Sequence, residues 1–103
     1  MFNLINMKSY ILKKSTRKGK RFMLTNEEGK TIHFGSDVGK TFIDHQDEKK
    51  KSAWEARHRQ DKGYNDRKSG IYYSKSLLWT KPTLNEAIAS LEKKDNIKII
   101  YKL

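Results

Sequence analysis

Two alternating segments joined by a short turn predict a β-hairpin in the first third of the chain. In residues 21–25, Phe22 and Leu24 fall on one side of an extended strand, and their neighbours fall on the other. Residues 31–34 alternate in the same way. The connection between them, residues 26–30, is polar, contains a glycine and has the length of a hairpin turn. The first part of the fold is therefore predicted to be β-structure.

A further strand precedes this hairpin and extends it to a meander. Residues 10–12 are a short apolar run, and the basic stretch 13–20, with its glycine, separates that run from the next strand. Alternation along the three strands predicts one buried side of the meander. Its members are Ile11, Phe22, Leu24, Ile32 and Phe34.

The rest of the chain is predicted to form helices and one last strand. Residues 47–62 have a helical composition, and Gly63 is expected to end that helix. Residues 83–86 form a capping-box sequence, and an apolar stripe at helical spacing follows them. Residues 97–103 alternate as a strand, which must pair with the meander because a lone strand is unstable. The predicted fold class is α+β: a small antiparallel or mixed sheet, made of the N-terminal meander and the C-terminal strand, with two to three helices packed on one face.

Length and composition predict one small basic domain over residues 1–103, with residues 1–8 as an extended arm. A chain of 103 residues has too few residues for a second core. Hydrophobic residues make up only 35% of it, so the core is small. Two Trp, five Tyr and four Phe nevertheless distinguish the sequence from a disordered one. Leu77, Leu78 and Trp79, in the most apolar run, are expected in the core.

Two classes of protein are disfavoured by what the sequence lacks. No stretch approaches the roughly twenty apolar residues of a membrane span, and the start has neither the basic segment nor the cleavage site of a secretion signal. With no cysteine, the chain has no disulfide framework and no thiolate metal site. We therefore expect a protein that is not secreted and has no membrane partner.

The balance of charge indicates the class of partner. Twenty-three Lys and Arg stand against twelve Asp and Glu, which gives a formal net charge of +11. Such an excess repels itself and disfavours a compact state unless the protein meets opposite charge. Phosphate backbones are the commonest polyanion. We therefore expect nucleic acid, DNA more than RNA, with an acidic protein surface as the alternative partner.

Two segments concentrate the cations: the loop between the first two strands, and the helix predicted over residues 47–62, whose one large apolar residue is Trp54. Either segment can follow a phosphate backbone, although basic loops also keep proteins soluble and a charged helix is often only solvated. The residues expected to contact phosphates are Lys13, Lys14, Arg17, Lys18, Lys20 and Arg21 in the loop, with Lys49, Lys50, Arg57 and Arg59 in the helix.

Two motifs that would indicate an enzyme are incomplete. Residues 35–41 are similar to a phosphate-binding P-loop, but three residues instead of four separate the first glycine from the Gly-Lys pair. We expect an ordinary loop there. Asp44, His45 and Asp47 would suit a small metal-dependent nuclease, yet no spacing fixes their convergence. The sequence predicts no catalytic residue, no metal site and no cofactor, and a nuclease is kept as an alternative.

Four stretches of the chain carry a resemblance to known proteins: residues 30–35, 42–47, 54–58 and 74–83. In order and spacing they resemble a family of short, basic, uncharacterised proteins of nucleocytoplasmic large DNA viruses. The resemblance implies a virus-encoded protein of the virion, or of the infected-cell cytoplasm and its virus factory. It implies no mechanism.

Charge and resemblance together predict a non-catalytic protein that binds nucleic acid through its phosphate backbone and accompanies a viral genome. One alternative is a minor structural or protein-interaction component of the virion or capsid. The other is the small metal-dependent nuclease.

Overall fold

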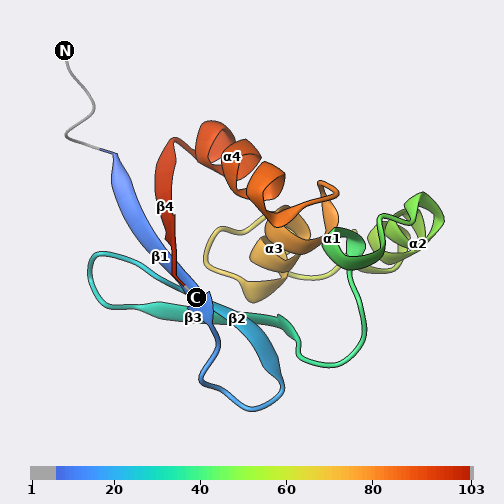
Figure 1. Ribbon diagram of the computed structural model, residues 1–103, viewed down its shortest axis with the longest axis horizontal. Coiled ribbons are helices and arrows are strands. Elements are labelled where there is room, and N and C mark those ends of the chain that lie inside the picture. The colour runs from blue at the N-terminus through green and yellow to red at the C-terminus, as the bar shows by residue number, and fades with distance from the viewer. Residues whose placement is uncertain (1–6, 103) are drawn as a thin grey trace.

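The computed structural model describes residues 7–102 and contains one four-stranded sheet (Figure 1). Its strands are β1 (Lys8–Lys14), β2 (Lys20–Thr25), β3 (Thr31–Ser36) and β4 (Ile97–Tyr101), in the order β3-β2-β1-β4. The meander β1-β2-β3 is antiparallel, whereas β4 pairs with β1 in parallel. The α+β class, with an N-terminal meander and a returning C-terminal strand in a mixed sheet, is confirmed.

The buried side of the sheet differs from the prediction at one residue. Leu12, not Ile11, pairs with Leu24 and is fully buried. Ile11 points to the opposite side, next to Ile100 of β4. The short apolar run from which this strand was predicted does not reveal which of its residues point inward. The other four predicted residues take the buried side: Phe22, Leu24, Phe34 and the half-buried Ile32.

The turn between β2 and β3 is held by the side chain of Asn26. Its Oδ1 accepts hydrogen bonds from the backbone N–H groups of Glu28 and Lys30, both at 2.9 Å. Gly29 completes the turn with a φ of +86°, a conformation that glycine adopts without a steric penalty. Local chemistry therefore explains the predicted hairpin.

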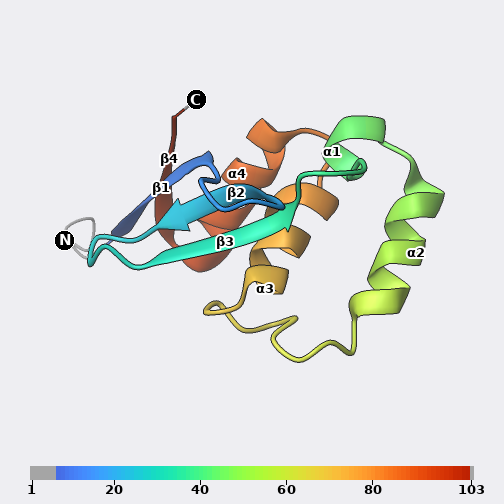
Figure 2. The same cartoon turned by 90° about the horizontal axis from the view of Figure 1, so that it is seen from below.

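Within residues 7–102, four α-helices and one π-helix lie between β3 and β4. They are α1 (Phe42–His45), α2 (Glu48–His58), α3 (Gly70–Ser74), the π-helix η2 (Lys75–Trp79) and α4 (Leu84–Asp95). Figures 1 and 2 show α3 and α4 against one side of the sheet, and α2 at the far end of the molecule, away from the strands.

Helix α2 is shorter than the predicted helix 47–62. It ends at His58, whose ring Nδ1 lies 2.6 Å from a carboxylate oxygen of Asp61. The Asp61 N–H also donates to the His58 carbonyl at 2.8 Å. These two bonds turn the chain before the expected end at Gly63. Trp54 is the only buried residue of α2, so this helix contributes one side chain to the core.

Helices α3 and η2 supply much of the core. Leu77, Leu78 and Trp79 are buried, as predicted. Tyr73 of α3 is also buried, and its ring lies 6.2 Å from that of Phe34 on β3. The most apolar run of the sequence therefore packs directly against the sheet.

Helix α4 leads the chain back to the sheet. Its N-cap hydroxyl, on Thr83, accepts a hydrogen bond from the Glu86 N–H at 3.2 Å, which is the first half of the predicted capping box. Ala87 and Leu91 of the predicted apolar stripe are buried. Asn96 ends the helix with a φ of +55°, in the left-handed region that asparagine tolerates, and β4 begins directly after it.

Side chains from the helices reach the outer edges of both edge strands. The Glu92 carboxylate of α4 accepts a hydrogen bond from the Ile99 N–H of β4 at 2.9 Å. On the opposite edge, the Ser74 hydroxyl of α3 accepts one from the Gly35 N–H of β3 at 3.1 Å.

The predicted N-terminal arm, residues 1–8, lies mostly outside the described residues. Lys8 is the first residue of β1, so the arm does not extend that far. Leu103, predicted as the end of the last strand, also lies outside the described part. Between residues 7 and 102, no helix has both the length and the apolar character that a membrane crossing requires.

Candidate nucleic-acid interface

The basic loop between β1 and β2 is a tight, hydrogen-bonded hairpin connection. The Ser15 N–H donates to the Arg21 carbonyl at 3.0 Å, and the Lys20 N–H donates to the Arg17 carbonyl at 3.2 Å. The loop borders a surface cavity of about 580 Å³ whose basic residues are Lys14, Arg17, Lys18, Lys20, Arg21 and Lys40. Five of the cations predicted to contact phosphate therefore line one concave surface, together with Lys40.

Helix α2 carries exposed cations and packs against the rest of the protein through Trp54. The Trp54 ring stacks on Trp79, with ring centres 5.0 Å apart and planes inclined by 11°. Lys50 and Arg57, seven residues apart and therefore on the same side of the helix, line a cavity of about 440 Å³. Lys40, His45, Ala53 and Trp79 complete that cavity.

Lys40 connects the two basic segments. It lines the hairpin cavity, the α2 cavity and a third cavity of about 570 Å³ that lies between them. Lys20 and Trp54 both border this third cavity, so it reaches from the hairpin loop to α2. Segments some thirty residues apart in sequence therefore contribute to one cationic surface, which we call the basic track: Lys14, Arg17, Lys18, Lys20, Lys40, Lys50 and Arg57.

Sequence reasoning missed Lys40. The only signal in the sequence is the position of Lys40 after Gly39 in a polar loop, whose spacing does not match a P-loop. Three of the residues predicted to contact phosphate lie away from the basic track. Lys13 points to the side of the sheet opposite Leu12. Lys49 on α2 and Arg59 directly after it are exposed and line none of these three cavities.

None of the seven cations in the basic track forms an ion pair with a carboxylate among the described residues. The described residues contain three ion pairs: Arg21–Asp44, His58–Asp61 and Arg67–Asp95. Among the predicted phosphate contacts, only Arg21 forms an ion pair within the described residues. Its guanidinium donates two hydrogen bonds to Asp44, of 2.7 and 2.9 Å, so it is not available to a phosphate.

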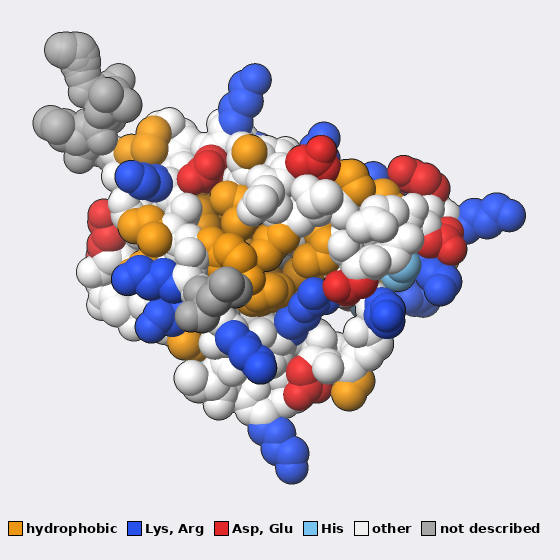
Figure 3. Space-filling model, viewed as in Figure 1, with side chains coloured by type: hydrophobic (Ala, Val, Ile, Leu, Met, Phe, Trp, Pro, Cys, Tyr) orange, Lys and Arg blue, Asp and Glu red, His pale blue; other side chains and the backbone are white. Residues whose placement is uncertain are grey.

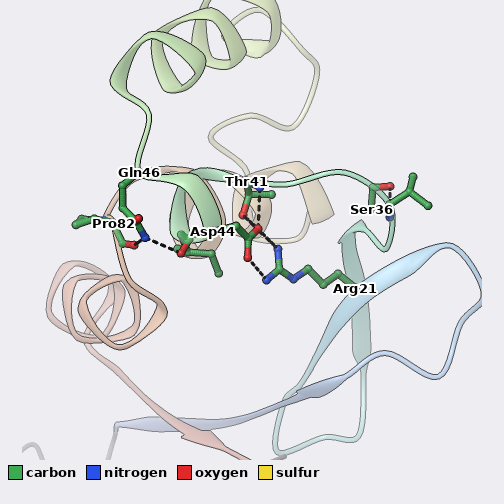
Figure 4. Close-up of polar contacts among 8 residues, drawn as sticks. Arg21, Ser36, Thr41, Asp44, Gln46 and Pro82 are labelled. Carbon is green, nitrogen blue, oxygen red and sulfur yellow. Dashed lines mark hydrogen bonds and ion pairs between the residues drawn. The ribbon is translucent and has the colours of Figure 1, made fainter.

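The ion pair fixes α1 against the sheet (Figure 4). Asp44 also accepts hydrogen bonds from the N–H and the hydroxyl of Thr41, at 2.8 and 2.9 Å. The Arg21 hydrogen bonds, followed by those from Thr41, hold the pKa of the Asp44 carboxyl well below its usual 3.8. At the other end of α1, the Gln46 amide donates to the carbonyl of Pro82 at 2.9 Å.

The three residues of the nuclease alternative are each engaged in local structure. Asp44 binds Arg21, and the Asp47 carboxylate accepts hydrogen bonds from the first turn of α2. The Nδ1 of His45 accepts a hydrogen bond from the Asp47 N–H at 2.9 Å, which leaves the proton of a neutral ring on Nε2. Across the described residues, no group of three or more His, Cys, Asp or Glu is arranged to hold a metal ion.

His45 has one further feature. Its Nε2 is buried and finds no hydrogen-bond partner among the described residues. The ring is packed edge-on against Trp79, with centres 5.6 Å apart, next to the α2 cavity. An unpartnered donor in such a place is unusual, because buried polar groups are normally satisfied.

Comparison with known proteins identifies similarity over part of the chain. Residues 10–58 match a protein family of unknown function, DUF5754. The match runs from β1 to the end of α2 and so includes the whole basic track. No curated protein and no solved structure matches the chain significantly.

Proposed function

We propose that the protein binds nucleic acid through the phosphate backbone, with little dependence on base sequence and without catalysis. The observation that carries this proposal is the basic track: two cationic segments and Lys40 line adjoining cavities, and none of these seven cations is ion-paired among the described residues. A row of unpaired cations along concave surfaces suits a linear polyanion.

The position of the lysines on α2 supports the same proposal. Lys49, Lys50 and Lys51 occupy the first turn of the helix, where the helix dipole is positive. Cations there cost about 0.3 to 1 kcal/mol each instead of stabilising the helix. A bound anion would remove that cost. Lys51 also contacts the ring of the buried Phe42, with its Nζ 5.1 Å from the ring centre, whereas Lys49 and Lys50 make no such contact among the described residues.

One observation favours the alternative of an acidic protein partner. Figure 3 shows apolar side chains gathered at the centre of the face seen in that view, between the strands and α4, with cationic side chains around them. An apolar centre with a charged rim is typical of a protein interface. Binding that depends little on salt, and copurification with capsid protein instead of nucleic acid, would favour this alternative.

A mobility shift on duplex and single-stranded oligonucleotides at two salt concentrations tests the proposal. The variant Lys14→Glu, Arg17→Glu, Lys18→Glu should bind duplex much more weakly and with a flatter salt dependence, since each lost phosphate contact reduces the slope by about 0.9. The matched control is Lys30→Glu, Lys93→Glu, Lys98→Glu, which makes the same charge change at exposed sites outside the basic track. Equal salt slopes for the two variants would rule out the hairpin loop as a contact.

The setting stays a prediction from the resemblance: a viral genome in the virion or in the virus factory. Cleavage of plasmid DNA with magnesium or manganese, abolished by Asp44→Asn, would instead support the nuclease alternative. We expect no cleavage.

A further inference from the structure

The α2 cavity concentrates positive charge around one concave space. Lys50 and Arg57 enter it from α2, and Lys40 enters it from the loop before α1. No carboxylate is among the residues that line it. The volume, about 440 Å³, exceeds what a phosphate group needs and leaves room for the sugar that carries it.

The cations of this cavity are free to bind an anion. Lys40, Lys50 and Arg57 take part in no ion pair within residues 7–102. Three like charges that line one cavity repel one another, and water screens this repulsion because all three side chains are exposed. Trp79, which is 8% exposed, forms an apolar part of the wall. An anion is the group that relieves this repulsion.

The wall of the cavity includes a side chain held in place by packing. His45 is fixed by the Asp47 N–H at its Nδ1 and by the Trp79 ring, and its buried Nε2–H has no partner among the described residues. The Arg57 guanidinium presents a planar fork that matches two oxygens of a phosphate. Lys40 and Lys50 supply further positive charge, and an ammonium group can bind an anion from many directions.

We propose that the α2 cavity binds the terminal phosphate of a nucleic-acid strand. A phosphomonoester carries a charge of about −1.5 to −2 near neutral pH, whereas an internal phosphodiester carries one negative charge. Three cations that line one cavity without a carboxylate favour the more highly charged group. Because Lys40 also lines the neighbouring cavities, a strand held by its end here continues along the basic track toward the hairpin loop. This inference rests on the proposed function and adds a site that recognises strand ends.

The test compares oligonucleotides of one sequence with a 5′-phosphate, a 3′-phosphate or only hydroxyl ends, by fluorescence anisotropy on the full chain. We expect at least one phosphorylated end to bind about tenfold tighter than the hydroxyl ends, as one additional charge-assisted contact provides. The variant Lys50→Gln, Arg57→Gln should abolish that preference. The variant Lys49→Gln, Arg59→Gln, with the same charge change at exposed positions on α2 and directly after its end, should keep it.

The outcomes separate this inference from the proposed function. Equal, salt-dependent affinity for all three oligonucleotides overturns the terminal-phosphate site and leaves backbone binding intact. A preference that survives Lys50→Gln, Arg57→Gln also overturns it. If no oligonucleotide binds, the proposed function fails. Calorimetric binding of a nucleoside 5′-monophosphate that depends on Lys50 and Arg57 would then assign the cavity to small phosphomonoesters, and overturn its role at strand ends. Circular dichroism of each variant confirms that it folds.

Discussion

The hairpin loop and helix α2 both carry cations of the basic track, but the fold holds them in different ways. The loop joins two strands of the central sheet, and backbone hydrogen bonds fix it, including one from the Asp37 N–H to the Gly19 carbonyl at 3.3 Å. Helix α2 lies away from the sheet and buries one side chain, Trp54. Several backbone hydrogen bonds therefore hold the loop in place. The packing of α2 against the rest of the protein depends largely on the stack of Trp54 on Trp79.

The two halves of the basic track therefore differ in what holds them in place. A bound strand would meet a hydrogen-bonded hairpin on one side and, on the other, a helix whose one buried residue is Trp54. Changes that undock the helix should therefore affect end recognition more than backbone binding, and the following predictions test that separation.

The largest effect is expected for Trp54→Ala. Removing a buried aromatic ring costs about 3 kcal/mol, because the stack on Trp79 is lost and α2 is no longer anchored. Urea unfolding should show this loss, and the preference for a phosphorylated end should disappear while salt-dependent binding through the hairpin persists. Trp54→Phe, which keeps a ring, serves as the control and should lose less than half as much. An unchanged unfolding midpoint for Trp54→Ala would contradict the single-anchor description.

A smaller effect is expected for Gly35→Ala. At a φ of +76°, a Cβ on residue 35 would lie 2.8 Å from Cδ1 of the buried Leu78 and 3.3 Å from Cβ of Arg21. Positive φ and overpacking together should cost about 2 to 3 kcal/mol. Gly19→Ala in the hairpin loop is the matched control, because its φ is +85° but nothing lies within 4 Å of the added Cβ.

Thermal unfolding of the two glycine variants measures the packing part of this difference. Gly19→Ala should lose only the cost of the left-handed conformation, about 1 kcal/mol. Similar melting temperatures for the two variants would mean that Leu78 moves aside without cost.

The smallest effect is expected for Asp44→Asn. Asp44 lies in α1, between the hairpin and α2 in the chain. The substitution removes the ion pair to Arg21 and weakens the cap of α1, for a cost of about 1 kcal/mol at neutral pH. The native pKa of Asp44 lies below the value of 3.8 expected for the unfolded chain, so the carboxylate stabilises the fold fully above about pH 4 and loses that effect as the pH falls further.

Chemical unfolding at pH 7 and pH 3 tests the prediction for Asp44. The difference between wild type and Asp44→Asn should shrink at the lower pH. Asp37→Asn, an exposed carboxylate in the same connection, is the control and should show little difference at either pH. A constant difference for Asp44→Asn would mean that its charge contributes nothing to stability.

Most of the sheet could be predicted because its signals are local. Alternation and the Asn26 turn define β2 and β3 without reference to the rest of the molecule. Which residues of β1 point into the core could not be predicted in the same way. Leu12 points inward because it pairs with Leu24 on one side and Tyr101 on the other, and those partners lie 12 and 89 residues further along the chain.

The candidate site could be predicted only in part for the same reason. Local charge density identified the hairpin loop and α2, but not their relation through Lys40, which depends on the tertiary position of the loop before α1. Nor could local charge density show that Arg21 is unavailable to a phosphate, because its ion-pair partner Asp44 lies 23 residues away. Composition indicated how many cations the chain has, whereas only the fold shows which of them remain available.

The hydrogen bond from the Ile99 N–H to the Glu92 carboxylate matters where many copies of the protein lie close together. A protein that covers a polyanion at high density brings many copies of its outer strands close together, and neighbouring molecules could then extend each other's sheets. The carboxylate from α4 occupies a donor that such an extension needs, and Ser74 does the same on the opposite strand. If the protein coats nucleic acid as we propose, these two contacts would reduce the risk that neighbouring copies join their sheets into an irreversible aggregate.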